Sequence, residues 1–179
     1  MAELWPVFIT GAVTVFGWYA TYLFAKYRED RTRRVDLLLK FRAQQIEQLY
    51  GPLLSLINQI FNVWDVQESI LKGVSNSEED AQRIKEFLWQ HYFTPLHQEI
   101  GALLRTKLYL LEGGRLPKSF TEYLEHATQE GVQHQLWTEL RIDTSNVKGR
   151  EWPDAFSTAV KRTLDHLMEE YQSGLARLK

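Results

Sequence analysis

The longest run of uncharged residues lies at the start of the chain. Residues 4–25 contain no Asp, Glu, Lys or Arg. At about 1.5 Å per residue a helix of this length covers roughly 33 Å, enough to cross a hydrocarbon core about 30 Å thick. We therefore predict a transmembrane anchor over residues 1–27; a buried helix of a soluble domain is the alternative. A basic collar follows directly, formed by Lys26, Arg28, Arg31, Arg33 and Arg34.

The position of the basic collar predicts the orientation of the anchor. Cytoplasmic flanks of membrane helices carry the excess of Lys and Arg, so the N-terminus is expected outside and the rest of the chain in the cytoplasm. Only Met1, Ala2 and Glu3 precede the apolar run, whereas a secretory signal peptide begins with positive charge. The expected location is a bacterial inner membrane, crossed once, with the collar contacting anionic lipids.

The remaining residues show apolar positions at helical spacing and no long alternation of period two. The predicted class is all-α: the anchor, a connecting helix over residues 28–50, and a cytoplasmic helical domain over 51–179 with about five helices. Gly51-Pro52 is expected to interrupt a helix, and Thr94-Pro95 is expected to break or kink one. The expected helices of the domain cover residues 53–73, 77–92, 95–112, 118–141 and 153–179.

One face of the predicted anchor carries small residues. At 100° per residue, Thr10, Thr14, Gly17 and Thr21 fall within about 60° of one another. Small residues permit close approach of membrane helices, and hydroxyls bond across the interface. This face predicts a homo-oligomer, in which it forms the helix interface or lines a pore. The alternative is that the threonines bond back to their own helix.

Charge and motifs exclude several classes of function. Residues 26–42 carry a formal charge of +4 and residues 43–179 a charge of −5, which argues against broad DNA binding. No phosphate-binding loop, zinc-protease or nucleophile-elbow motif occurs, and the chain has no Cys. The five histidines are spread over several predicted helices. We therefore predict no enzyme activity, no metal and no cofactor.

A binding site is the more plausible source of function. Arg105, Lys107, Arg115 and Lys118 place four cations within fourteen residues, around a Gly-Gly turn and the start of a helix. Free backbone N–H groups at such a start bind anions. Trp137 supplies an aromatic ring on which a base stacks. These residues predict a site for a nucleotide or short oligonucleotide; a solvated helix face with core aromatics is the alternative.

Three blocks carry a resemblance to known proteins. Residues 46–57, residues 93–126 and the late Trp152-Pro153 resemble small bacterial proteins with one N-terminal membrane helix and an all-helical cytoplasmic domain. In layout the chain is similar to antiphage membrane effectors, namely the cyclic-oligoadenylate-gated effectors of type III CRISPR systems and the DNA-oligomer-gated Hailong effector. This similarity implies a tetramer whose cytoplasmic domain binds a nucleotide-derived ligand.

The combined prediction is an oligomeric single-pass membrane effector of antiphage defence. Its cytoplasmic domain is expected to bind a nucleotide or oligonucleotide and thereby gate ion flux or membrane disruption. The main alternative is a membrane-tethered protein-interaction module or scaffold without conductance. A tethered enzyme ranks third.

Overall fold

The fold is all-α, as predicted. A computed structural model describes residues 5–74, 77–144 and 146–176, with side chains for all of these except residues 5–15 and 74. No strand occurs in this part of the chain. The helices are α1 (Trp5–Gln45), α2 (Gly51–Val74), α3 (Glu78–Leu88), α4 (Thr94–Thr106), α5 (Lys118–Leu140) and α6 (Asp154–Ala176).

Two π-helical turns join helices that the sequence predicted to be separate. Ile46–Tyr50 joins α1 to α2, and Trp89–Phe93 joins α3 to α4. The predicted interruption at Gly51-Pro52 is therefore wrong, and so is a break at Thr94-Pro95, because each proline follows a π turn within a continuous helix. A proline lacks the N–H group of a regular turn and clashes with the carbonyl four residues before it, and the wider π turn accommodates this defect. The described residues up to 144 thus contain three continuous helical segments, namely α1 with α2, α3 with α4, and α5. The sequence predicted five separate helices over the same range.

The first π turn depends on a glycine. The N–H of Gly51 donates to the carbonyl of Ile46, and a Cβ atom at position 51 would lie 2.8 Å from that oxygen. We expect Gly51→Ala to lower the free energy of unfolding by about 1–3 kcal/mol, as overpacking does. Urea unfolding measures the change. Gly73→Ala is the control, because a Cβ atom there meets nothing within 4 Å; equal effects at the two positions would contradict the explanation.

The predicted fourth helix ends earlier than expected. α4 stops at Thr106, and two short 3-10 turns follow, Leu108–Leu110 and Glu112–Gly114. The carbonyl of Leu110 accepts a hydrogen bond of 2.7 Å from the side chain of Gln45 in α1, and the Leu110 side chain is fully buried. The end of α4 at Thr106 allows Leu110 to be buried and its carbonyl to accept the hydrogen bond from Gln45. The predicted helix end at residue 112 is wrong for that reason.

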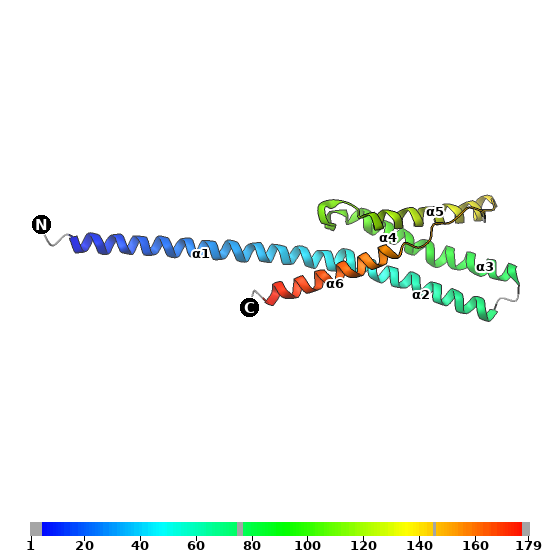
Figure 1. The fold of residues 1–179 in the computed structure, drawn as a ribbon, viewed down its shortest axis with the longest axis horizontal. Helices are drawn as coiled ribbons and strands as arrows, with labels where there is room; N and C mark the ends of the chain where they lie inside the picture. The colour runs from blue at the N-terminus through cyan, green and yellow to red at the C-terminus, as the bar shows by residue number, and fades with distance from the viewer. Residues whose placement is uncertain (1–4, 75–76, 145, 177–179) are drawn as a thin grey trace.

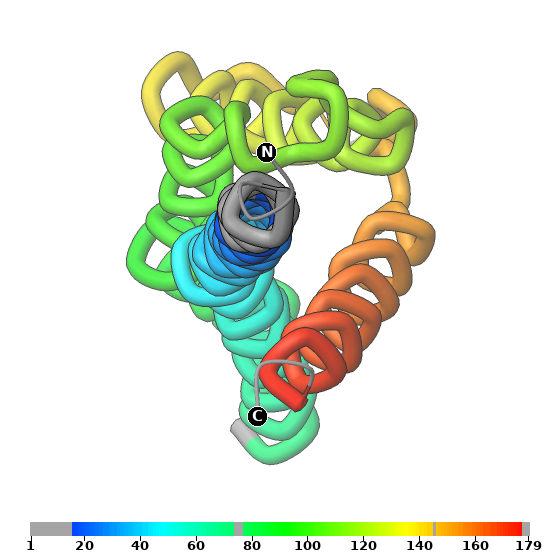
Figure 2. The backbone as a smooth tube through the Cα atoms, turned by 90° about the vertical axis from the view of Figure 1, so that its left-hand side faces the viewer, coloured from blue at the N-terminus to red at the C-terminus, as the bar shows by residue number. Residues whose placement is uncertain are grey.

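The core of the helical body lies where α2, α4, α5 and α6 meet the π turns. α4 packs on one side of α2, with α5 beyond α4, and α6 packs along α1 and α2 and also contacts α5 (Figures 1 and 2). The apolar faces of these helices supply the buried side chains. The largest fully buried side chains are Leu49, Leu53, Ile57, Ile60, Phe93, Ile100, Leu104, Leu110, Phe120, Tyr123, Phe156 and Leu167.

α1 extends from this body as a single helix (Figure 1). Its 41 residues correspond to a length of about 60 Å. Leu39 is the first buried residue among those with described side chains, and Phe16, Trp18 and Phe24 are 74–79% exposed. In the fully described part of the chain, no helix combines the length and the apolar character needed to cross a membrane. The transmembrane anchor therefore stays a prediction, with the side chains of residues 5–15 outside the described set.

Candidate functional site: a buried histidine–glutamate cluster

Three polar side chains from α4 and α5 meet inside the apolar body. His97 lies in α4, while His126 and Glu130 lie one turn apart on α5. The side chains of His97 and His126 are 7% and 2% exposed, and that of Glu130 is 27% exposed. On α5 the same inward face carries Tyr123, three residues before His126. We refer to His97, His126 and Glu130 as the His–Glu cluster.

Both imidazole rings are held by a hydrogen bond at Nδ1. The Nδ1–H of His126 donates to the carbonyl oxygen of Arg150 at 2.7 Å, since a carbonyl only accepts. Nδ1 of His97 lies 2.8 Å from the hydroxyl of Tyr123. The other ring nitrogen, Nε2, is buried and has no hydrogen-bond partner in either histidine. The two rings therefore present Nε2 to a common space.

The carboxylate of Glu130 faces this common space. Its Oε2 lies 3.4 Å from Nε2 of His126 and 3.9 Å from Nε2 of His97. Burial, with His126 as a smaller second cause, lowers the pKa of His97 to about 4, and burial also lowers the pKa of His126. Burial raises the pKa of Glu130 to about 7. Both histidines are thus neutral near pH 7, the form in which imidazole binds metals.

Aromatic rings surround the cluster and limit its contact with water. Trp152, which precedes α6, lies edge-on to His126 with ring centroids 5.7 Å apart, and also edge-on to Tyr123 at 5.5 Å. Trp89 of the second π turn lies 5.7 Å from the His97 ring. These rings make the surroundings of the cluster apolar, so electrostatic interactions within it are stronger than at the surface.

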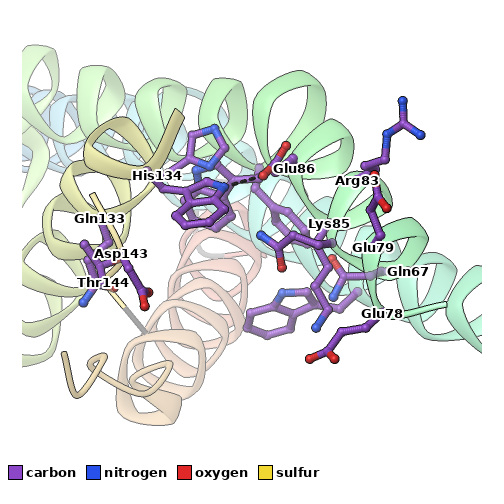
Figure 3. Close-up of a pocket in the computed structure, with 15 residues that line it drawn as sticks. Gln67, Glu78, Glu79, Arg83, Lys85, Glu86, Gln133, His134, Asp143 and Thr144 are labelled. Carbon is purple, nitrogen blue, oxygen red and sulfur yellow. Dashed lines mark hydrogen bonds between the residues drawn. The ribbon is translucent and has the colours of Figure 1, made fainter. Parts of the chain in front are cut away.

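A groove of about 960 Å³, drawn in Figure 3, has Trp89 in its lining, the residue whose ring also lies beside His97 of the cluster. α2, α3 and α5 form its walls, and Glu86 of α3 accepts a hydrogen bond from the indole of Trp137 in α5. The lining contains four acidic residues and two cations. The acidic residues are Glu78, Glu79, Glu86 and Asp143, and the cations are Arg83 and Lys85. This balance disfavours an anionic ligand in the groove.

Among the predicted ligand-binding residues, the structure separates Trp137 from Lys118. Lys118 and Trp137 lie 19 residues apart on α5, which corresponds to about 28 Å. Trp137 belongs to the acidic groove. Lys107 donates to the side chain of Gln48 at 3.0 Å, and Lys118 pairs with Glu122 at 3.4 Å. Arg105 and Arg115 are exposed. The four cations stay a predicted anion site without Trp137.

The predicted small-residue face of the anchor is described only in part. The side chains of Thr10 and Thr14 lie outside the described residues. Gly17 is exposed, and a Cβ atom there would meet nothing within 4 Å. The hydroxyl of Thr21 donates to the carbonyl of Gly17 at 2.8 Å, which is the bond back to its own helix that we considered as the alternative. The basic collar residues are all exposed.

Sequence reasoning missed the His–Glu cluster. The five histidines were interpreted as scattered, but the packing of α4 on α5 brings His97 and His126 within 5.9 Å, measured between ring centroids. The spacing of His126 and Glu130, four residues apart on a helix, was the available signal. It is a weak signal, since His166 and Glu170 have the same spacing on the exposed side of α6.

Comparisons with known proteins add no information on function. The chain matches no protein-family model, no curated protein sequence and no solved structure. The resemblance to membrane-anchored bacterial proteins and antiphage effectors therefore stays a prediction from the sequence. Function has to be argued from the projecting helix, the body and the polar cluster within it.

Proposed function

We propose that the protein is a membrane-anchored effector whose helical body senses a ligand and transmits its binding through α1. The observation that carries this proposal is the form of α1, a continuous helix that leaves the body and ends in the uncharged segment 4–25. The aromatic residues around Phe16 and Phe24 are exposed along the projecting part, as lipid-facing residues are. The body is then held on the side of the basic collar, in the cytoplasm of a bacterium.

Contacts at the C-terminal end of α1 support the transmission of ligand binding from the body to this helix. Gln45 of α1 donates to the carbonyl of Leu110, and Gln48 of the following π turn accepts from Lys107. Arg42 of α1 forms an ion pair of 2.9 Å with Glu170 of α6. A ligand bound near Arg115 would therefore act on the loop that contacts α1 directly. Such a ligand shifts α1 only if it binds two arrangements of this junction with different affinity.

The partners that follow from the proposal are lipids, further copies of the chain and an anionic ligand. A nucleotide or short oligonucleotide fits the cations of the predicted site, and a tetramer is the assembly favoured by analogy with antiphage effectors. A membrane-tethered module that positions a protein partner is the second candidate. The contacts of Gln45 and Gln48 with the loop favour the effector, because a simple tether needs no such coupling.

Membrane fractionation tests the anchor. We expect the full-length chain in the membrane pellet after a high-salt wash. A double variant, Val13→Arg and Phe16→Arg, should move into the soluble fraction, because each arginine near the centre of a membrane helix costs about 2.5–3.5 kcal/mol. The control is Phe87→Arg with Tyr92→Arg, at exposed positions of the body. A wild-type chain in the soluble fraction, or a double variant that stays in the pellet, contradicts the anchor.

Ion flux distinguishes an effector from a tether. Liposomes that contain the full-length protein should release ions when the anionic ligand is added, and charge reversal at Arg115 and Lys118 should abolish the response. Flux that is absent under all conditions, with the protein in the membrane, favours the tethered module.

A further inference from the structure

The buried nitrogens and the carboxylate of the His–Glu cluster converge without a lysine or arginine partner among the described residues. Nε2 of His126 carries a lone pair, because the hydrogen of the neutral ring is on Nδ1, and this lone pair faces the carboxylate of Glu130 at 3.4 Å. Nε2 of His97 faces the same oxygen at 3.9 Å. Among the described residues, no lysine or arginine forms an ion pair with Glu130. Lone pairs that converge in an apolar site are unfavourable without a cation.

A single proton does not resolve this arrangement. A proton on Glu130 can form a hydrogen bond with only one of the two nitrogens, and both distances exceed a normal bond of about 2.7–3.2 Å. When that proton bonds to His126, Nε2 of His97 stays buried and without a partner if the ring hydrogen is on Nδ1. If the Tyr123 hydroxyl donates to Nδ1 and the hydrogen is on Nε2, that N–H faces Glu130 across 3.9 Å, which exceeds hydrogen-bond distance. A cation with several ligands satisfies all three atoms together.

The separations in the cluster fit a metal ion. The three donor atoms lie within 4.8 Å of one another. Tetrahedral zinc with bonds of about 2.0–2.1 Å to His nitrogen and carboxylate oxygen places its ligand atoms about 3.3 Å apart. The pair His126–Glu130, at 3.4 Å, already has about this separation. Nε2 of His97 lies 3.9 Å from Glu130 and within 4.8 Å of Nε2 of His126, so metal binding requires a shift of the His97 ring toward both.

The surroundings of the two rings also match those of metal ligands. A histidine that binds a metal through Nε2 usually donates its Nδ1 hydrogen to an oxygen, which fixes the ring and its tautomer. His126 has the Arg150 carbonyl in this role, and His97 has the Tyr123 hydroxyl. These oxygens come from the loop before α6 and from α5, so both rings are oriented from outside the cluster.

We propose that His97, His126 and Glu130 bind one divalent transition-metal ion of the Zn²⁺ class. Two imidazoles and one carboxylate are ligands for which Zn²⁺, Co²⁺ and Ni²⁺ compete, whereas Mg²⁺ and Ca²⁺ prefer oxygen ligands. Three protein ligands leave at least one position for water or an added ligand. Solvent reaches the site from the side of Glu130, whose side chain is 27% exposed. The ion would join α4 to α5, and this site is independent of the membrane anchor.

Metal titration of the full-length protein tests the proposal. The protein, carrying a tag without histidine, is purified in detergent, stripped with a chelator and titrated with Zn²⁺ by calorimetry. We expect one Zn²⁺ per chain. Co²⁺ should give the visible absorption bands of a tetrahedral or five-coordinate nitrogen–oxygen site, and Zn²⁺ should remove them. The variants His126→Asn and Glu130→Gln should each weaken Zn²⁺ binding by about 100-fold or more.

A matched control distinguishes the buried cluster from surface histidines. His166 pairs with Glu170 at the same spacing as His126 with Glu130, but its side chain is 64% exposed. His166→Asn should leave stoichiometry and affinity unchanged. Circular dichroism checks that Glu130→Gln, which preserves side-chain volume, is folded. The proposal is overturned if the wild type binds no Zn²⁺, if folded Glu130→Gln binds it equally well, or if His166→Asn removes the binding.

Discussion

Replacing Phe156 with alanine is expected to lower the free energy of unfolding by about 3–5 kcal/mol. The ring is fully buried, is stacked on Tyr123 with centroids 4.3 Å apart, and meets Phe120 edge-on at 5.0 Å. Alanine leaves a cavity at the point where α6 packs on α5. Domains of this size have a total stability of about 5–15 kcal/mol, so the loss is a large fraction of the whole. Urea unfolding followed by circular dichroism measures it.

An exposed aromatic residue provides the control for this prediction. Phe87 in α3 is 54% exposed and contacts the rings of His91 and Tyr92 at the surface. Phe87→Ala should change the free energy of unfolding by less than about 1 kcal/mol. If the two variants lose equal stability, Phe156 does not hold α6 to α5 in the way that its burial indicates.

The helices were predictable because local signals mark their ends. Ser77, the first residue of the helix predicted over 77–92, caps α3 by accepting a hydrogen bond of 3.1 Å from the N–H of Asp80. Pro153 directly precedes α6, which begins at Asp154. Each of these features acts within a few residues. Sequence patterns of the same length therefore reveal them.

The π turns were not predictable from local signals. Gly51-Pro52 and Thr94-Pro95 look like helix breaks, since proline is incompatible with a regular helix interior. Whether the chain bends there or inserts a wider turn depends on the packing of the helices on both sides. Leu49 and Phe93, which belong to the two π turns, are buried in the core. Burial of these residues keeps both helices continuous.

The candidate site depends on the same long-range packing. His97 and His126 are 29 residues apart and share no sequence pattern, so only the contact of α4 with α5 brings them together. The four predicted cations, by contrast, are close in sequence, yet Lys107 and Lys118 have partners in Gln48 and Glu122. Proximity in sequence identified a basic segment. It did not identify which side chains converge.

Glu130→Gln is expected to stabilise the metal-free protein, and to do so more strongly as pH rises. Burial raises the pKa of Glu130 from 4.5 to about 7 in the folded chain. A raised folded-state pKa gives stability that is fully present below pH 4.5 and lost as pH increases through 7. Glutamine stays neutral and keeps the volume. The variant should therefore gain on the order of 3 kcal/mol over the wild type above pH 7, and little at pH 4.5.

The other ionisable groups of the cluster affect both proteins in a similar way. His97 and His126 have lowered folded-state pKa values, so their contribution is present above pH 6.5 and lost on acidification in either chain. Urea unfolding at pH 5 and pH 8 with a chelator isolates the difference that Glu130 makes. Glu139→Gln, at an exposed position of α5, is the control and should show no such pH dependence. If the stability that Glu130→Gln gains over the wild type falls as pH rises, the prediction is contradicted.

Adding Zn²⁺ at pH 8 should reduce or reverse the difference in the free energy of unfolding between Glu130→Gln and the wild type. A ligand that binds only the folded state stabilises it by about 2.7 kcal/mol at 100 times its dissociation constant. The wild type has all three donor atoms and gains this stability, whereas Glu130→Gln lacks the carboxylate. Metal binding would then explain why the chain contains a buried carboxylate that destabilises its metal-free form. Residues needed for function often lower the stability of a protein in this way. If Zn²⁺ leaves the difference in stability between the two proteins unchanged, Glu130 only weakens the fold.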